Sequence, residues 1–341
     1  MAMRLADRFS WDFWIARDGP TYHLFFLNAP KSIEHPDFRH FNVTIGHAIS
    51  EDLVTWTELE PALKPSETAS WDDFTTWTGS TIQRPDGTWM MFYTGTSNAD
   101  HGLKQRIGAA VSTDLVHWER LPQNPLLAVD PRYYETINRK IWHEEALRDP
   151  WIYRIPDDDV WHMAFTARET SGPSFGRGVI GHATSPDLLH WSSTEPLYRS
   201  GIYGHMEVPQ IFEHQGHWYC LFCSGSREIE ATYKASGKQG DVIGTHYLMA
   251  DHPMGPWRLP EDEFLVGDPI GRLYAGRMVH APCGALVFLA FENFDTNGRF
   301  TGGLSDPMPV TVLQDGRLRV DASHYGITHS KPKNWLKAAN A

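Results

Sequence analysis

Short runs of apolar and aromatic residues recur along the whole chain and are separated by polar turns. Five of these runs resemble one another, at residues 21–27, 88–94, 160–166, 217–223 and 285–291. Each is rich in aromatic and β-branched side chains, and four of them follow a turn that contains Gly or Asp, as in a hairpin. This pattern is typical of β-strands, so we predict an all-β protein.

A second repeated element follows the first. Copies occur at residues 46–56, 108–118 and 181–191, and a degenerate copy lies at 244–257. The first three copies have the pattern of a strand, a turn with Ser and Asp, and a short strand that begins at Trp. One multi-strand unit repeated five times predicts a five-bladed β-propeller, because a radial arrangement covers both faces of every four-stranded antiparallel blade. We expect residues 302–321 to complete the fifth blade of a single domain over residues 1–330, with a C-terminal tail at 331–341.

The start of the innermost strand of each blade is predicted by counting back 10 to 12 residues from each aromatic run. This step reaches Asp12, Trp77, Asp149, Glu207 and residues 274–276. At equivalent positions in successive blades, these side chains would all point to the axis at one end of the propeller. A solvated turn is the commoner explanation for one carboxylate, but three in the same phase are costly to bury without a function. We therefore expect Asp12, Asp149 and Glu207 to share one central pocket.

Composition and charge exclude several classes of function. The net charge is -12 and no run of Lys or Arg is present, which argues against a nucleic-acid partner. No apolar run approaches the roughly 18 to 20 residues of a membrane span, and the N-terminal residues lack the apolar core of a signal peptide. We therefore expect a cytoplasmic protein without a membrane partner. The 14 Trp, 12 Tyr and 17 Phe suit both sheet cores and stacking on sugars.

Cysteine and histidine residues do not indicate a redox or metal centre. The three cysteines are an odd and sparse set, which suits a reducing compartment better than a disulfide framework. Cys220 and Cys223 spell C-x-x-C inside an apolar run, so we expect them in the core. Residues 143–145 and His280 suggest a metal, but neither has ligand spacing that requires one. We expect no metal and no cofactor.

Four short motifs around the expected pocket are similar to those of known glycosidases. Residues 11–14 (W-D-F-W) resemble the W-D-x-W nucleophile motif of glycoside hydrolase family 68, the levansucrases, and stand where family 32 has N-D-P-N. Residues 77–80 (W-T-G-S) are similar to W-S-G-S, and residues 148–150 match R-D-P. Residues 207–209 (E-V-P) resemble the E-C-P or E-R-P acid/base motif. The motifs follow the family order, so the chain resembles a five-bladed furanosidase of family 32/68 type.

The resemblance implies a role for each of these residues. Asp12 would attack the anomeric carbon, Glu207 would act as acid and base with a raised pKa, and Asp149 would bind ring hydroxyls as the oxocarbenium ion develops. Arg148 either braces a neighbouring blade or reaches Glu207. Aromatic core packing would account for at least half of the nearby tryptophans. The residues expected to bind substrate are Trp11, Trp14, Trp77, Thr78, Ser80, Arg148 and His205.

The chain also departs from the family pattern. Thr78 replaces the usual Ser, Val208 replaces Cys or Arg, and the asparagines that flank the nucleophile are missing. These differences concern substrate identity more than reaction type. Family 32 enzymes usually carry a C-terminal β-sandwich, and little chain remains for one after residue 321, so the sequence resembles a propeller-only member.

Three functions remain open at this point. The first is a retaining β-fructofuranosidase or fructosyltransferase acting on a small oligosaccharide such as sucrose or a short fructan. The second is an inverting arabinofuranosidase or xylosidase of family 43 type, and the third is a sugar-binding propeller without turnover. A separation of about 5 to 5.5 Å between the two catalytic carboxyl groups predicts retention, and about 6.5 to 9.5 Å predicts inversion. The oligomeric state is left open.

Overall fold

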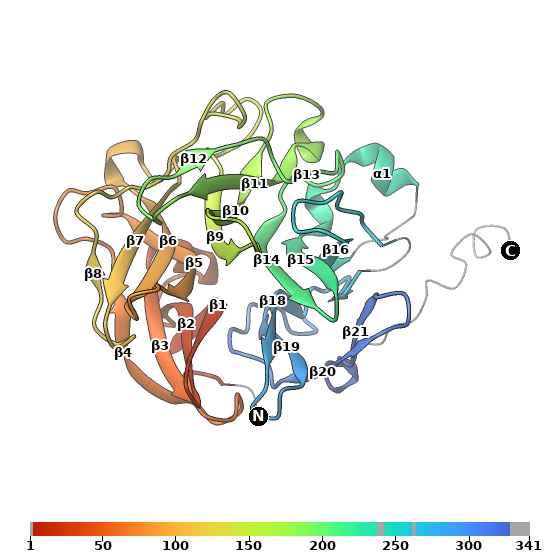
Figure 1. Cartoon of the computed structure of the whole chain (residues 1–341), viewed down its shortest axis with the longest axis horizontal. Coiled ribbons are helices and arrows are strands. Elements are labelled where there is room, and N and C mark those ends of the chain that lie inside the picture. The colour runs from red at the N-terminus through yellow and green to blue at the C-terminus, as the bar shows by residue number, and fades with distance from the viewer. Residues whose placement is uncertain (1–2, 237–241, 261–263, 328–341) are drawn as a thin grey trace, which may run out of the picture.

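The computed structural model describes residues 3–236, 242–260 and 264–327. Over these residues the chain is almost entirely β, and five antiparallel sheets stand around a common axis (Figure 1). Each sheet is built from consecutive strands, and neighbouring inner strands contact one another. The predicted all-β, five-bladed propeller is confirmed. The expected tail at 331–341 lies outside the described residues.

The described elements have the following bounds. The first two blades contain β1 (Arg8–Asp18), β2 (Thr21–Pro30), β3 (Thr44–Ser50), β4 (Thr57–Leu63), β5 (Thr75–Gln83), β6 (Trp89–Thr96), β7 (Arg106–Ser112) and β8 (Glu119–Arg120). The third blade contains β9 (Leu147–Arg154), β10 (Trp161–Arg168), β11 (Gly178–Ser185), β12 (Ser192–Ser193) and β13 (Tyr198–Arg199). The last two contain β14 (Glu207–His214), β15 (His217–Ser224), β16 (Ile243–Ala250), β17 (Val266–Asp268), β18 (Leu273–His280), β19 (Leu286–Glu292), β20 (Met308–Val312) and β21 (Leu318–Val320). The short helices are η1 (Pro36–Phe41), η2 (Asn98–Asp100), η3 (Ser174–Gly176), η4 (Ser226–Glu228), α1 (Ala231–Ala235) and η5 (Ser323–Tyr325).

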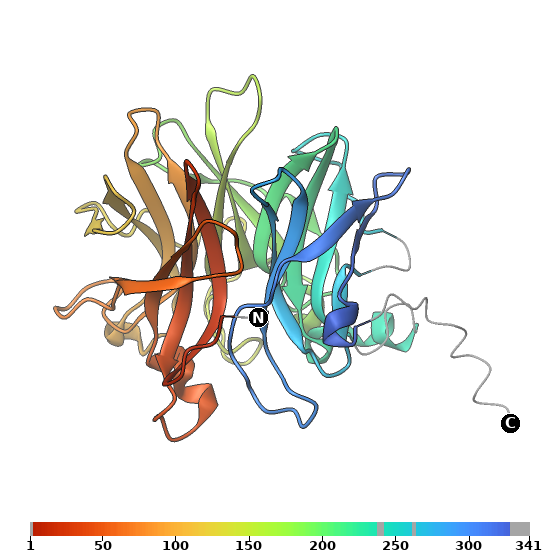
Figure 2. The same ribbon diagram turned by 90° about the horizontal axis from the view of Figure 1, so that it is seen from below.

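In every blade the first strand lies at the axis and later strands lie further out. The strand order is β1-β2-β3-β4 in the first blade, and the labels β1, β5, β9, β14 and β18 gather near the centre of Figure 1. In the third blade both β12 and β13 pair with β11. The side view shows that the segments carrying η1 and α1 leave the propeller on the same side (Figure 2). Because every blade begins with its inner strand, the residues that begin the inner strands meet at one end of the axis.

The repeated aromatic runs form the second strand of each blade. All eight residues of β6 are buried, and β2 is buried at every position except its two ends. Such strands are covered on both faces, because the sheet packs between two neighbouring blades, and so they read as continuous apolar runs. Between the second and third blades, for example, Met90 and Phe92 share a core with Met163 and Phe165. The hydrophobic effect thus holds the blades together face to face.

The second repeated element forms a tight turn after the third strand in each of the first three blades. In the first copy, the Ser50 hydroxyl accepts a hydrogen bond from Leu53 N (2.9 Å), and Asp52 Oδ1 accepts from Val54 N (2.8 Å) and Thr55 N (2.7 Å). These bonds hold the leucine in the left-handed region, with φ of 65°. The same bonds recur in the second and third blades, at Ser112, Asp114 and Leu115 and at Ser185, Asp187 and Leu188.

Contacts between the first and last blades close the ring. The Tyr22 hydroxyl donates to His280 O (2.8 Å), and Gly303 N donates to Ser10 O (2.9 Å). The N-terminal segment adds an antiparallel bridge between Met3 and Leu304. No disulfide takes part, since all three cysteines are free, and Cys220 and Cys223 are buried in β15 as predicted. No helix within the described ranges has the length and apolar character needed to cross a membrane.

Candidate active site

A β-bulge recurs at the same height in all five innermost strands. In the first blade Trp11 pairs with Leu27 and Trp14 with Phe25, so β1 carries one residue more than β2 over this stretch. The other four blades show the same shift. The residues before the bulge are Trp11, Trp77, Arg148, Glu207 and Tyr274, and those that follow them are Asp12, Thr78, Asp149, Val208 and Ala275.

The bulge corrects the predicted alignment of the blades by one residue. Asp12 and Asp149 do occupy equivalent positions, but Glu207 lies one position earlier and is equivalent to Arg148. Counting along the chain does not detect this, because equivalent positions are defined by cross-strand pairing and not by the distance from the aromatic run. Asp149 and Val208 are held in the left-handed region, with φ of 58° and 54°. Such strain costs about 1 kcal/mol or more per residue and is concentrated at functional sites.

The three predicted catalytic carboxylates nevertheless meet in one place. Asp12, Asp149 and Glu207 all line a cavity of about 410 Å³ over the second and third blades. Asp12 and Glu207 also line an adjoining cavity of about 700 Å³ over the fourth and fifth blades. The pocket is therefore open on both sides of the carboxylates, with room for a sugar on either side.

Asp12 is held from the second blade and surrounded by negative charge. The Thr78 hydroxyl donates to Asp12 Oδ2 at 2.8 Å. Burial, together with the nearby carboxylates of Asp149 and Glu207, raises the pKa of Asp12 to about 7, and the Thr78 hydrogen bond and Arg277 oppose this rise. Asp12 therefore holds a proton more tightly than an exposed carboxyl group does.

Asp149 is held by hydrogen bonds to its side chain and to its main chain. Its Oδ2 accepts hydrogen bonds from the Thr166 hydroxyl (2.7 Å) and from Val208 N (3.1 Å). Its own main-chain N–H donates to the Thr94 hydroxyl at 2.9 Å. Burial raises its pKa, and the guanidinium of Arg148 acts in the opposite direction. These contacts fix the carboxylate in one orientation.

Glu207 accepts hydrogen bonds through both carboxylate oxygens. Arg148 Nη2 donates to Oε1 at 2.6 Å, and the Tyr274 hydroxyl donates to Oε2 at 2.6 Å. Arg148 Nη1 also donates to Glu144 Oε1 at 2.7 Å. The structure contains both contacts considered for Arg148, because it reaches Glu207 and also donates through Nη1 to Gln105 Oε1 (3.2 Å) beside the second blade. Two neighbouring blades therefore orient Glu207 from opposite sides.

His205 lies behind this network as a neutral imidazole. Burial, and to a lesser extent the charge of Arg148, lowers its pKa to about 3. Its Nε2 lies 2.9 Å from Trp142 Nε1 and its Nδ1 lies 3.1 Å from Arg148 Nη2, and both of these partners are donors. A neutral ring accepts only one of them, so its N–H faces a carboxylate, either Glu228 (3.4 Å from Nδ1) or Glu144 (3.5 Å from Nε2). His205 lines the catalytic cavity, but its polar atoms are engaged by protein groups.

Two tryptophans of the motifs line the pocket. Trp77 Nε1 donates to His40 O at 2.9 Å, which fixes its ring at the rim. Trp11 lines both cavities, although its side chain is almost completely buried. The edge of the His40 ring packs on Trp11, with ring centroids 5.7 Å apart. Trp77 therefore offers the more accessible aromatic surface to a substrate.

Trp14 and Ser80, by contrast, do not line either cavity of the pocket. Trp14 is fully buried and donates through Nε1 to the Thr81 hydroxyl at 2.9 Å. Ser80 accepts a hydrogen bond from Ile152 N at 3.3 Å. Both predictions of substrate contact are corrected. The physical reason is that these residues lie beyond the bulge, where the strand has passed below the pocket and contacts the next blade.

Several pocket residues were not predicted. Tyr274 lies in the stretch that spacing had placed in phase with the carboxylates, so a signal for it existed. Glu144 and His40 lie in loops without periodicity, and only the closed ring brings them to the pocket. Within the described ranges no group of three or more His, Cys, Asp and Glu residues has an arrangement that could hold a metal ion. Glu144 instead balances the charge of Arg148.

The sequence matches a known family over most of its length. A model described as the glycosyl hydrolases family 32 N-terminal domain matches residues 15–295, a range that includes Asp149 and Glu207 and begins just after Asp12. The chain is 30% identical over 194 residues to a fructan 6-exohydrolase of Beta vulgaris, covering 56% of this chain and 29% of the relative. It is 31% identical over 198 residues to a β-fructofuranosidase of Arabidopsis thaliana, insoluble isoenzyme CWINV6, covering 56% and 32%. The matches span less than a third of the length of these curated relatives.

Solved structures share the propeller over almost the whole chain. An inulosucrase from Halalkalicoccus jeotgali bound to kestose has a TM-score of 0.73 at 22% identity, covering 93% of this chain and 87% of that protein. A mutant levansucrase of B. subtilis has a TM-score of 0.74 at 15% identity, covering 92% and 86%. At these identities the similarity shows the fold alone.

Proposed function

The chain belongs to glycosyl hydrolase family 32, and from this premise we propose that it is a retaining glycosidase that cleaves β-fructofuranosidic bonds in small oligosaccharides. The observation that carries the proposal is the convergence of Asp12, Asp149 and Glu207 on one cavity. Relatives named as fructan exohydrolase and β-fructofuranosidase support a fructoside substrate. The cavities on both sides of the carboxylates have room for either water or a second sugar to act as the acceptor.

In the proposed reaction Asp12 attacks the anomeric carbon and Glu207 protonates the oxygen of the leaving sugar. Water, or an acceptor sugar that Glu207 deprotonates, then releases the fructosyl group from Asp12. The cycle needs Asp12 ionised and Glu207 protonated at its start. Since the pKa of Asp12 is about 7 in the free pocket, we expect activity to fall as the pH is lowered through this value.

Asp149 is proposed to hold the sugar ring without exchanging protons. Both hydrogen bonds to its carboxylate end on Oδ2, so Oδ1 is the oxygen proposed to accept from ring hydroxyls. These bonds strengthen as positive charge develops on the ring in the transition state. Trp77 is proposed as the aromatic surface beside the ring.

The runner-up functions are less well supported. Membership of family 32 favours a fructosidase over an inverting enzyme of family 43 type. A sugar-binding propeller without turnover would be expected to have lost one of the carboxylates, and all three are present in the pocket. We also propose a cytoplasmic location, which the three free cysteines support.

The proposal is tested by assaying the wild type, Asp12→Asn and the control Asp18→Asn on sucrose, inulobiose, levan oligomers and an aryl arabinofuranoside. Asp18 ends the same strand and is exposed. We expect wild type and control to release fructose, and Asp12→Asn to lose on the order of 10⁴-fold in kcat. An NMR time course should show the β-anomer first, which corresponds to retention. Initial release of the α-anomer, or activity in Asp12→Asn, would contradict the nucleophile assignment.

A further inference from the structure

Arg277 crosses the propeller axis beneath the catalytic pocket. It lies on β18 of the fifth blade and its side chain is almost completely buried. Its Nη1 donates to Val208 O (3.0 Å) and Pro209 O (2.9 Å), and its Nε donates to Phe13 O (3.3 Å). Phe13 directly follows Asp12, and Val208 directly follows Glu207. One side chain therefore binds the main chain next to both proposed catalytic carboxylates.

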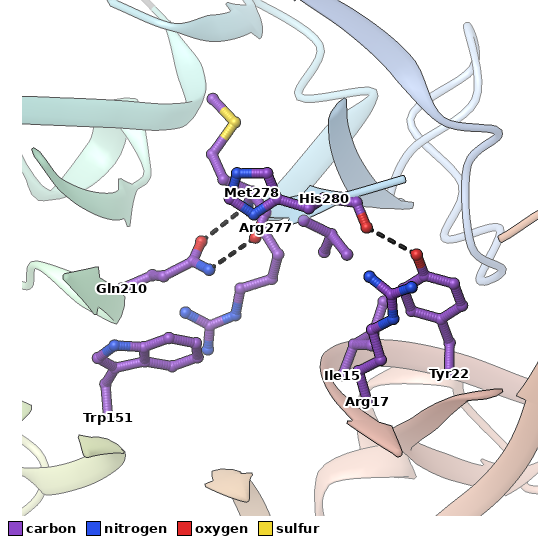
Figure 3. A pocket seen from close by; sticks show the side chains of 9 residues that line it. Ile15, Arg17, Tyr22, Trp151, Gln210, Arg277, Met278 and His280 are labelled. Atoms are coloured by element: carbon purple, nitrogen blue, oxygen red, sulfur yellow. Dashed lines mark hydrogen bonds between the residues drawn. The ribbon is translucent and has the colours of Figure 1, made fainter. Parts of the chain in front are cut away.

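Arg277 also lines a second cavity, distinct from the one that holds the carboxylates. This cavity, of about 320 Å³, is lined by Arg277, Gln210 and Trp151 from three different blades. Figure 3 shows the guanidinium beside the Trp151 ring, and its carbon lies 5.2 Å from the ring centroid. Asp12 lines only the cavities at the catalytic end. Arg277 therefore lines the cavity at the opposite end of the axis while it bonds to the main chain next to Asp12 and Glu207.

Arg277 is a buried cation without a direct carboxylate partner. Among the described residues no carboxylate lies at ion-pair distance from its guanidinium, and its hydrogen bonds go to main-chain carbonyls. Burial lowers its pKa to about 10, and Asp149 and Asp12 are among the groups that oppose this fall. The residue therefore stays charged at neutral pH. A buried cation is costly, so its charge calls for a reason.

The equivalent residues of the other blades show that ring closure does not need a charge. Three residues after the start of the bulge, each blade carries a side chain that bonds to the next blade. In the first four blades these are the neutral residues Trp14, Ser80, Trp151 and Gln210. Only the fifth blade uses an arginine at this position, and it bonds to Phe13 O in the first blade and Val208 O in the fourth, each next to one of the proposed catalytic carboxylates. A hydrogen-bonding role alone does not account for this choice.

We propose that Arg277 is a positioning residue for the reaction, which holds the main chain behind Asp12 and Glu207 and whose charge favours the ionised form of Asp12. The inference rests on the proposed function for its consequence in catalysis. Its electrostatic part concerns Asp12 itself and does not depend on turnover.

The test compares Arg277→Gln, Arg277→Lys and a neutral control at the equivalent position, Gln210→Met. The ionisation of Asp12 is followed by NMR titration of ¹³C-labelled carboxylates, with its signal assigned from Asp12→Asn. We expect Arg277→Gln to raise the titration midpoint of Asp12 by about one pH unit, and Arg277→Lys and Gln210→Met to leave it within a few tenths of the wild-type value. If Arg277→Gln does not fold, Arg277→Lys still tests the charge. In that variant we expect the titration midpoint of Asp12 to match that of the wild type although the melting temperature of the protein is lower.

The kinetic readout separates the two proposals. In Arg277→Gln we expect kcat to fall by 10-fold to 100-fold and the acid limb of kcat/KM to move up with the titration of Asp12. Arg277→Lys should restore the acid limb and part of kcat. An unmoved Asp12 titration in Arg277→Gln, or a shift in Gln210→Met of the same size, would overturn the inference. If the wild type cleaves no furanoside but Arg277→Gln shows the expected shift in the titration of Asp12, the proposed function is overturned and the electrostatic role of Arg277 is kept.

Discussion

The two ends of the inner strands use their polar side chains in opposite ways. At the bulge, Asp12, Asp149 and Glu207 bring like charges together in a cavity. Two or three residues further along, the side chains bond across to the next blade: Trp14 to Thr81, Trp151 to Ile211, and Gln210 to Met278 through both its amide atoms. The same strands thus carry a proposed catalytic end, which is costly to fold, and a structural end whose polar groups are hydrogen-bonded. A single β-bulge lies between the two ends.

The raised pKa of Asp12 determines how the folding stability depends on pH at the catalytic end. The folded protein binds a proton at Asp12 more tightly than the unfolded chain does, since the pKa is about 7 instead of 3.8. Stability is therefore lost as the pH rises from about 4 to 7 and the buried group must ionise. The bonds of the structural end each contribute about 1 kcal/mol net. Variants at the two ends should move activity and stability independently, except at Arg277, which is proposed to act on Asp12 from the structural end.

After the loss of Asp12 itself, the largest expected effect is at the contact that orients Glu207. We predict that Arg148→Met lowers kcat by about 100-fold to 1000-fold, because Glu207 loses its guanidinium partner and Glu144 is left without its counter-charge. The measurement is steady-state kinetics on the best substrate. The control is Arg154→Met, which removes an exposed arginine from the outer end of the same strand. Equal losses in both variants would show that the effect is structural.

A change at the structural end should affect stability and leave the chemistry nearly intact. We predict that Gln210→Leu lowers the free energy of unfolding by about 2 to 4 kcal/mol, because Met278 N and Met278 O both lose their buried partner. The ratio kcat/KM at 25 °C should change by less than about threefold. Chemical denaturation and initial-rate assays measure the two quantities. A large loss of kcat without a loss of stability would break the separation of the two ends.

The smallest expected effect is a gain in stability from a substitution at the catalytic end. We predict that Asp12→Asn, although inactive, is more stable than the wild type by about 1 to 2 kcal/mol at pH 8, because the cost of ionising the buried carboxyl disappears. The gain should shrink towards zero at pH 4, where the wild type is protonated as well. Melting temperatures at both pH values measure it, with Asp18→Asn as the exposed control. A gain that is the same at both pH values would point to packing instead of charge.

Much of the fold and part of the site could be predicted from the pattern of residues. The five aromatic runs are the buried second strands, and the Ser-x-Asp turns recur with the same hydrogen bonds in three blades. Repeats are visible because each blade needs the same apolar faces and the same turn chemistry. The phase of the repeats also located Asp12 and Asp149, and placed Glu207 within one residue of its true position.

The sequence by itself determined the five blades, the all-β architecture and the identity of three candidate carboxylates, because these depend on local periodicity and on motifs that lie within one strand. Only the tertiary structure decided how the side chains meet. The register that places Glu207 one position before the equivalent of Asp149, the hydrogen bond from Tyr274 to Glu207 and the hydrogen bond from Arg277 to Phe13 O all depend on cross-strand pairing and on closure of the ring. The spacing of residues along the chain reveals neither of these, because an extra residue in one strand is recognised only by comparison with the strand that it pairs with.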